Sequence, residues 1–356
     1  MDSSSLSDNR CNMSDFPRIT TSILEAHKDE VWNVKWSHDG TYLASASKDK
    51  SVIIWRRGSP LSSPQDWAAH HILRDHRYWV TCLAWSLDDT ILLTGSGHII
   101  KLWNTETGVC IRTLDDHTEF VTALSWLPDG LGFISGGLDR KIIIWDADGS
   151  VRDAWGATAI RITELALTPD SKYLVAVGME EESQPDIPPA TEETHSDENA
   201  ERVGIIVFDF ETKQTESSTR LEGQLTSMQI TQDSRYALMN HSPNEILLWD
   251  IHAGRMECKY SGQSQLRHVI RSCFGGVDRS LVASGSEDGK VYIWHSETGV
   301  LLEALTGHGE GSVNAVDWNP TNERMFASCS DDHSIRIWEP AVEATHDGPS
   351  TSASAR

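Results

Sequence analysis

The sequence predicts an all-β fold, a seven-bladed β-propeller closed by an N-terminal strand that completes the last blade. Two observations lead to this prediction. Seven strongly apolar runs each end in an aromatic residue: Trp55, Trp103, Trp145, Phe208, Trp249, Trp294 and Trp338. The intervals between these residues are 48, 42, 63, 41, 45 and 44. Most of them match the roughly 40–45 residues of a four-stranded propeller blade.

The two ends of the chain determine how the ring should close. Residues 1–17 are polar and Ser-rich, and we expect them to be disordered. Residues 18–24, RITTSIL, have the pattern of a strand and precede the first repeat. After Trp338 only 18 residues follow, and we expect residues 340–356 to be a disordered tail. The last blade therefore needs residues 18–24 as its fourth strand, and the propeller should span residues 18–339.

The first repeat shows how each blade should be built. Short strands at 31–36, 42–47 and 52–55 are separated by the turns SHDG and KDKS. The same order continues along the chain, with one long interval of 63 residues in blade 4. Residues 180–201 within it hold nine acids, three prolines and no Lys or Arg. This composition predicts a disordered acidic insertion at about 180–202.

A set of four polar and aromatic residues recurs at fixed offsets. Blade 1 has His27, Ser45, Asp49 and Trp55, and blade 3 has His117, Ser135, Asp139 and Trp145. Blade 7 has His308, Ser328, Asp332 and Trp338, and blade 6 keeps Ser284, Asp288 and Trp294. One Ser-His-Asp set would suggest a hydrolase. Because a nucleophile is needed once and a structural bond in every blade, the repetition favours a structural role.

This pattern resembles the WD40-repeat family over about residues 18–338. The resemblance implies a buried network in each blade, from Asp to His, from His to Ser, and from Ser to the Trp indole N–H. A buried indole and imidazole do need such hydrogen-bond partners. Gly97 and Pro243 stand where blades 2 and 5 should have the Asp, and blade 4 has none. We expect these three blades to be held mainly by apolar packing.

Three stretches are similar to a narrower group. Residues 269–276, 284–295 and 318–338 resemble the WD-repeat subunits of GID/CTLH ubiquitin ligases. The resemblance implies a non-catalytic scaffold that recruits substrates for proteasomal degradation. Those subunits carry a helical LisH–CTLH region before their propeller. Only 26 residues precede His27 here, so we expect the chain to lack that region, and assembly through it is not implied.

The fold resemblance also implies a partner-binding face. It is formed by the residues that follow each tetrad His and precede each tetrad Asp. These positions predict partner-binding roles for Trp32, Trp79, Phe120, Glu30, Lys48, Arg161, His268, Glu287 and Asp331. The aromatic residues lie in blades 1–3, whereas Glu287 and Asp331 belong to blades 6 and 7. Aromatic residues beside polar groups are typical of interface hot spots. We expect a protein or peptide partner with an apolar residue next to Lys or Arg.

Composition limits the other functions. The formal net charge of −23 disfavours nucleic acid and anionic membranes and favours basic partners. A basic-peptide or histone-binding adaptor outside a ligase therefore remains the alternative. No unique nucleophile, carboxylate pair, Gly-rich phosphate loop or Cys/His ligand cluster is evident, so we expect no enzyme, cofactor or metal. The N-terminus has no secretory pattern, and we expect a cytoplasmic or nuclear protein.

Overall fold

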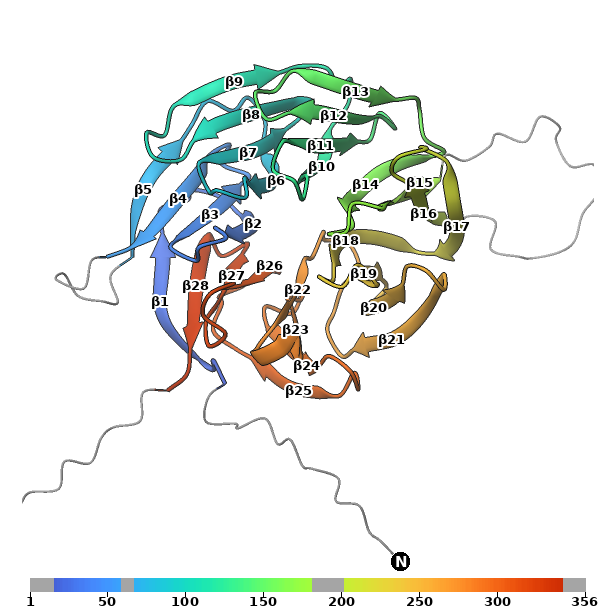
Figure 1. Ribbon diagram of the computed structural model, residues 1–356. Helices are drawn as coiled ribbons and strands as arrows, with labels where there is room; N and C mark the ends of the chain where they lie inside the picture. Colours follow the sequence, from blue (N-terminus) through green and yellow to red (C-terminus); the bar gives the residue numbers. More distant parts are fainter. Residues whose placement is uncertain (1–15, 59–66, 181–201, 342–356) are drawn as a thin grey trace, which may run out of the picture.

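A computed structural model describes residues 16–58, 67–180 and 202–341 of the chain. Seven four-stranded antiparallel sheets are arranged in a ring, which confirms the predicted propeller (Figure 1). Disorder is expected for residues 1–17, about 180–202 and 340–356. Apart from their boundary residues, these segments lie outside the described residues.

In blades 1 to 6 the four strands follow one another along the chain from the centre of the ring outward, and in blade 7 the outermost strand is β1. Blades 1 to 3 contain β2 (Val31–Trp36), β3 (Tyr42–Ser47), β4 (Val52–Arg57) and β5 (Trp67–Leu73); β6 (Val80–Trp85), β7 (Ile91–Ser96), β8 (Ile99–Asn104) and β9 (Cys110–Leu114); and β10 (Val121–Trp126), β11 (Gly132–Gly137), β12 (Ile142–Asp146) and β13 (Val151–Trp155). Blades 4 to 6 contain β14 (Ile160–Leu167), β15 (Tyr173–Glu180), β16 (Arg202–Asp209) and β17 (Thr215–Glu222); β18 (Gln224–Ile230), β19 (Tyr236–Ser242), β20 (Glu245–Asp250) and β21 (Arg255–Ser261); and β22 (Ser272–Gly275), β23 (Leu281–Ser284), β24 (Val291–His295) and β25 (Leu301–Leu305). Blade 7 contains β26 (Val313–Trp318), β27 (Phe326–Ser330), β28 (Ser334–Glu339) and β1 (Ile19–Glu25). A 3-10 turn, η2 (Val277–Arg279), lies within blade 6.

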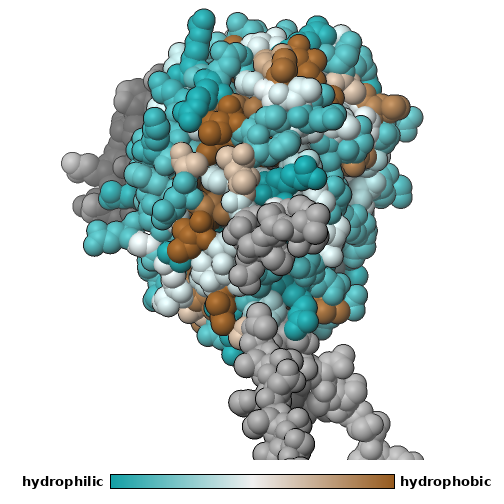
Figure 2. Space-filling model, turned by 90° about the vertical axis from the view of Figure 1, so that its left-hand side faces the viewer, coloured by the Kyte–Doolittle hydropathy of each residue, from teal (hydrophilic) through white to brown (hydrophobic). Residues whose placement is uncertain are grey.

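The position of each strand in its blade explains its sequence. The second and third strands pack against blades on both sides, so most of their side chains are buried on both faces. They are small or apolar residues with two serines in β3, and the apolar run 52–55 in β4. The outermost strands have one face in solvent, and β17 alternates accordingly between exposed and half-buried residues. Figure 2 shows the outer wall on the side of β1 and β5 as mostly hydrophilic, with separate apolar patches. Scattered patches of this kind are ordinary protein surface and do not mark a binding site.

The ring closes where the N-terminal strand joins the last blade. β1 pairs antiparallel with β28, from Ile19 opposite Glu339 to Glu25 opposite Ser334 (Figure 1). Leu24 of β1 belongs to an apolar cluster that also contains Trp36 of blade 1 and Ile335 of blade 7. The predicted closure is therefore confirmed, and it rests on a sheet edge and on a core shared by blades 7 and 1.

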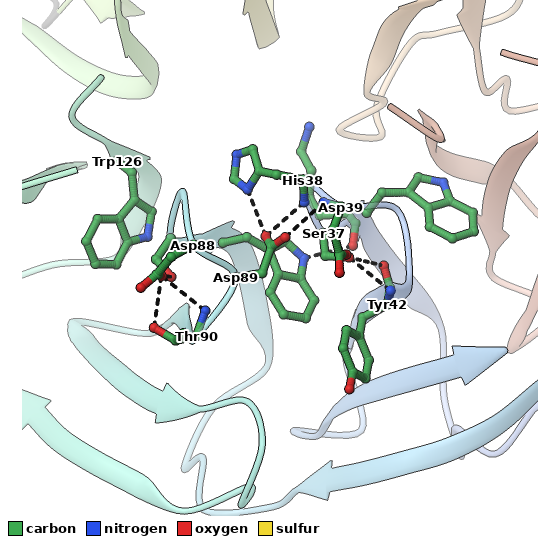
Figure 3. Close-up of polar contacts among 12 residues, drawn as sticks. Ser37, His38, Asp39, Tyr42, Asp88, Asp89, Thr90 and Trp126 are labelled. Atoms are coloured by element: carbon green, nitrogen blue, oxygen red, sulfur yellow. Dashed lines mark hydrogen bonds and ion pairs between the residues drawn. The ribbon is translucent and has the colours of Figure 1, made fainter. Parts of the chain in front are cut away.

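Polar contacts join neighbouring blades at the face that carries the turns between first and second strands, here called the bottom face. The Asp89 carboxylate of blade 2 accepts the main-chain N–H groups of His38 at 2.8 Å and Asp39 at 2.9 Å, and it also contacts His38 Nδ1 (Figure 3). The indole N–H of Trp36 donates to the carbonyl of Asp317 in blade 7 at 3.1 Å. These bonds fix blades 7, 1 and 2 relative to one another.

Within the described residues, no helix has the length and apolar character needed to cross a membrane. No three His, Cys, Asp or Glu side chains in the same part of the chain are grouped closely enough to hold a metal ion.

Candidate functional site

Hydrogen bonds connect the recurring His, Ser, Asp and Trp residues in blades 1, 3 and 7. In blade 3 His117 Nδ1 lies 3.0 Å from Asp139, His117 Nε2 lies 2.8 Å from Ser135 Oγ, and the Trp145 indole donates to the same hydroxyl at 2.8 Å. Blade 1 has matching distances of 3.0, 2.7 and 2.9 Å among His27, Asp49, Ser45 and Trp55. Blade 7 has 3.0, 2.7 and 2.8 Å among His308, Asp332, Ser328 and Trp338.

Burial governs the charge state of these networks. Burial lowers the pKa of His117 despite the opposing Asp139 charge. Burial would raise the pKa of Asp139, but the N–H of Thr118 and the His117 ring outweigh it and lower that pKa. The hydroxyl-bearing residues Ser45, Ser135 and Ser328 are 0% exposed. A hydroxyl enclosed between an imidazole and an indole cannot reach a substrate, so the geometry fits a structural bond.

Blade 6 does not form the network expected for Ser284, Asp288 and Trp294. The Trp294 indole donates instead to the main-chain carbonyl of Ser261 at 3.0 Å. The Ser284 hydroxyl donates to the carbonyl of Gly285, and Asp288 accepts from the Tyr292 hydroxyl at 2.9 Å. The physical reason is the missing imidazole, since Gln265 stands near the expected His and no ring bridges Ser284 to Asp288.

Blade 2 contains more of the network than its sequence suggests. His76 Nε2 lies 2.9 Å from the hydroxyl of Thr94, and the Trp103 indole donates to that hydroxyl at 3.0 Å. The Thr94 hydroxyl thus occupies the position that the Ser hydroxyl has in blades 1, 3 and 7. The buried His76 Nδ1 has no hydrogen-bond partner among the described residues, because Gly97 replaces the Asp. Burial and then the charge of Lys101 lower the pKa of His76 to about 4.

The loops before each first strand and between each second and third strand lie at the same end of the blade, here called the top face. Six blades have a β-bulge in the first strand near this face. The bulge residues are Trp32, Thr81, Thr122, Thr163, Thr226 and Asn314. A bulge releases one residue from the ladder and redirects its side chain. In blades 1 to 3 the residue five positions after the His is therefore the bulge residue of the first strand.

Most bulge residues link a blade to the next one. The hydroxyl of Thr122 donates to the carbonyl of Ile162 at 2.8 Å, and that of Thr163 donates to the carbonyl of Leu225 at 2.8 Å. Thr81, Thr226 and Asn314 make equivalent bonds to Val121, Ile270 and Val31. In blade 1 the link to the Thr81 carbonyl comes from Asn33 at 3.3 Å. Trp32 is therefore released from the linking role.

Trp32 begins a row of aromatic side chains on the top face, which we call the aromatic ridge: Trp32, Trp79, Phe120 and Tyr78. The rings of Trp32 and Trp79 meet edge to face with centroids 6.0 Å apart. Trp79 stacks on Phe120 at 5.8 Å, and Tyr78 lies 6.3 Å from Phe120. Trp79 is 39% exposed and Tyr78 is 42% exposed, while Trp32 and Phe120 are half-buried. Three sequence-predicted residues thus lie together in one surface spanning blades 1–3.

Sequence reasoning missed Tyr78, although a signal for it exists. Gly97 has a φ of +60°, and a Cβ there would lie 2.6 Å from the Tyr78 ring. The Ser96 hydroxyl also donates to the Tyr78 carbonyl at 2.7 Å. The glycine that replaces the blade 2 Asp therefore leaves room for this ring, so the departure from the repeat coincides with the ridge.

The predicted acidic residues are held by donors from this chain. Glu30 accepts the Trp32 indole N–H at 2.9 Å and the Lys48 ammonium at 2.7 Å. Burial would raise the pKa of Glu30, but these two hydrogen bonds outweigh it and lower the pKa. Asp331 accepts the side chain of Asn314 at 2.7 Å and a main-chain N–H. These carboxylates therefore order the top face as well as carrying charge there.

The remaining predicted residues are paired in other sectors. Arg161 of blade 4 contacts Glu119 at 2.8 Å, beside Phe120. His268 lies 3.2 Å from Glu287 in blade 6. Lys48 and Arg161 thus border the aromatic ridge, whereas His268 and Glu287 form a separate group two blades away from blade 1.

Comparison with known proteins agrees with this architecture. The sequence profile of the family described as "WD domain, G-beta repeat" matches residues 18–56, 67–104, 108–146, 258–295 and 299–339. Blades 4 and 5 fall largely outside these matches, yet they form the same four-stranded sheets.

Similarity to individual proteins covers nearly all of this chain. It is 38% identical over 95% of its length to "WD repeat-containing protein 26 homolog" of Arabidopsis thaliana. It is 40% identical over 94% to "WD repeat-containing protein WDS homolog" of the same plant, and 37% identical over 94% to "GID complex subunit 7" of Schizosaccharomyces pombe. The chain spans 53%, 60% and 61% of these relatives. The repeat matches and the seven blades together show that the chain belongs to the WD40-repeat family of β-propellers.

Proposed function

We propose that this chain is a non-catalytic recognition propeller of a GID/CTLH-type ubiquitin ligase, where it recruits substrates for proteasomal degradation in the cytoplasm, the nucleus or both. The similarity to GID complex subunit 7 over 94% of this chain supports the ligase assignment. The chain corresponds to 61% of that relative, so the proposal concerns the propeller and its binding face.

The single observation that carries the recognition role is the aromatic ridge. Four large rings in consecutive blades contact one another, and two of them are about two-fifths exposed. The scaffold does not need a Trp at the bulge of blade 1, because Asn33 makes the link to blade 2. Tryptophan and tyrosine are the residues most enriched at interface hot spots. The ridge therefore suits an apolar or aromatic side chain of a partner protein.

The expected basic residue beside that apolar side chain stays a prediction. Glu30 is held by Trp32 and Lys48, so it offers little free charge. Asp29 and Glu119 border the ridge in blades 1 and 3. Each also pairs with a cation of this chain, Lys48 at 3.7 Å and Arg161 at 2.8 Å, but their side chains are 40% and 51% exposed, against 30% for Glu30. We assign the acidic contribution to these two residues, which a Lys or Arg of the partner would approach from solvent.

Affinity purification with mass spectrometry tests the ligase assignment. Recovery of ubiquitin-ligase subunits with the tagged chain is the expected result. Recovery of histones without ligase subunits would support the alternative, an adaptor for basic peptides. If no protein is enriched over a tag-only control, both assignments fail.

A further inference from the structure

A second feature of the top face lies in blade 6, in the loop between β21 and β22. Its fixed point is Gln265, whose side chain is 0% exposed. The Gln265 amide donates to the Thr226 hydroxyl at 2.8 Å and accepts from the Asn240 amide at 3.2 Å. Gln265 thus anchors the loop in the core where other blades have the tetrad His.

The carboxylate of Glu287 holds the residues that follow. Its Oε1 accepts the main-chain N–H groups of Leu266 at 2.9 Å, Arg267 at 2.7 Å and His268 at 2.9 Å. Burial would raise the pKa of Glu287, but these N–H groups outweigh it and hold the pKa at about 2. Three consecutive amides converging on one oxygen leave the backbone little freedom.

Bonds to both neighbouring turns complete the anchoring. The N–H of Gln265 donates to the Asn244 side chain at 2.7 Å, and the N–H of Asn244 returns a bond to the Gln265 carbonyl at 3.0 Å. The N–H of Ser264 donates to the Ser286 hydroxyl at 3.0 Å. The loop is therefore fixed to the turns of blades 5 and 6 at once.

This anchored backbone directs apolar side chains into solvent. Leu266 is 56% exposed and Val269 is 49% exposed. Arg267 and His268 between them are also exposed, and no described residue pairs with the Arg267 guanidinium. In blade 1 the residue at the position of Leu266, directly after His27, is Lys28. The scaffold thus does not require a Leu at this position.

We propose that residues 266–269 form a docking knob for a second protein partner, one that presents an apolar pocket with a carboxylate at its edge. Leu266 would fill the pocket, Val269 would extend the apolar contact, and Arg267 would pair with the carboxylate. An ordered backbone reduces the entropy lost on binding, so an exposed Leu on such a loop can act as an anchor. Within this loop, Arg267 is the exposed charge that no described residue pairs, and it favours an acidic group on the partner over a basic one.

The knob is distinct from the aromatic ridge. The ridge occupies blades 1–3, whereas the knob belongs to blade 6 and makes none of the ridge's ring contacts. The two surfaces also differ in the chemistry that they select. One chain can therefore hold two different partners on its top face.

A random peptide library displayed on phage tests the knob directly. Peptides are selected on the wild-type protein and then measured against Leu266→Asp, Arg267→Glu and the control Leu131→Asp. Leu131 is 65% exposed on the bottom face, so it matches the chemical change without touching the knob. The proposal predicts peptides that combine a large apolar residue with Asp or Glu. Their binding should fall at least tenfold in both knob variants and remain unchanged in the control.

Two further variants separate docking from general damage. Arg267→Glu should regain binding when the peptide's acid is exchanged for Lys. Glu287→Ala should weaken binding through loss of the ordered loop, and Glu287→Gln, which keeps the acceptor oxygen, should restore part of it. The proposal is overturned if no peptide depends on Leu266, if the selected peptides depend on Trp79 instead, or if the charge exchange gives no recovery.

Discussion

The indole N–H of Trp32 donates to the carboxylate of Glu30 over 2.9 Å. The Lys48 ammonium, in the turn between the second and third strands of the same blade, donates to Glu30 in turn at 2.7 Å. Glu30 is therefore held in place while it accepts the indole N–H. This arrangement fixes the orientation of Trp32 before any partner arrives, and it sets the edge of the ring against Trp79. A pre-ordered aromatic surface binds at lower entropic cost than a mobile one.

The buried networks should make a measurable contribution to stability. Asp139→Ala removes the acceptor for the Thr118 N–H and for His117, and it leaves the buried His117 Nδ1 without that partner. We expect the free energy of unfolding to fall by about 2–4 kcal/mol, measured by urea denaturation. Asp288→Ala in blade 6 is the matched control, since that carboxylate belongs to no His network, and it should cost less than about 1 kcal/mol. Equal effects of the two changes would contradict the assignment.

The His76 imidazole of blade 2, whose buried Nδ1 has no hydrogen-bond partner among the described residues, predicts a pH dependence. Burial and Lys101 hold the pKa of His76 at about 4, below its ordinary value of 6.5. As pH falls, His76 is therefore protonated in the unfolded chain before it is protonated in the folded one. The free energy of unfolding should decrease as pH falls from about 6.5 to 4. The shift corresponds to about 3 kcal/mol across that window.

Comparison with His76→Gln isolates this contribution. Burial raises the pKa of Glu164 to about 7. Ionisation of this carboxyl therefore lowers the free energy of unfolding in the opposite direction, as pH rises from 4.5 to 7. Its effect is shared by both proteins and cancels in the difference. We expect the loss of unfolding free energy between pH 7 and pH 4.5 to be smaller in His76→Gln than in the wild type. Parallel pH profiles would show that His76 is not the titrating group.

Ring closure predicts a contrast between two adjacent residues of β1. Leu24 is 4% exposed within the core shared by blades 7 and 1, whereas Ile23 is 49% exposed. Leu24→Ala should lower the free energy of unfolding by about 2–4 kcal/mol through the cavity that it leaves. Ile23→Ala should change it by less than about 0.5 kcal/mol. If thermal or urea unfolding is equally insensitive to both, β1 does not hold the ring closed.

The sequence predicted the architecture well because the architecture repeats. Burial of the third strand on both faces imposes an apolar run ending in an aromatic residue, and seven such runs mark the blades, including blade 4 with Phe208. The closing strand followed from a count of strands after Trp338. Both arguments depend on spacing along the chain, which a single sequence contains.

The local contacts were harder to predict. Spacing alone could not reveal that the Trp294 indole would choose the Ser261 carbonyl, because that choice depends on the missing imidazole. It also could not show that Thr94 would replace the Ser of blade 2. Tyr78 escaped notice because its place in the ridge depends on the missing Cβ of Gly97. Such contacts join residues from separate strands and loops, so they appear only in three dimensions.

Partner capture by ridge variants tests the central claim most directly. Trp32→Thr installs the residue found at the bulge of four other blades, and Trp79→Ala removes the exposed centre of the ridge. Leu131→Ala serves as the exposed control on the bottom face. Each variant is compared with the wild type by quantitative affinity purification and by melting temperature. We predict that both ridge variants keep the wild-type melting temperature and lose a shared set of proteins that Leu131→Ala retains. Retention of every wild-type partner by correctly folded Trp32→Thr and Trp79→Ala would contradict the account.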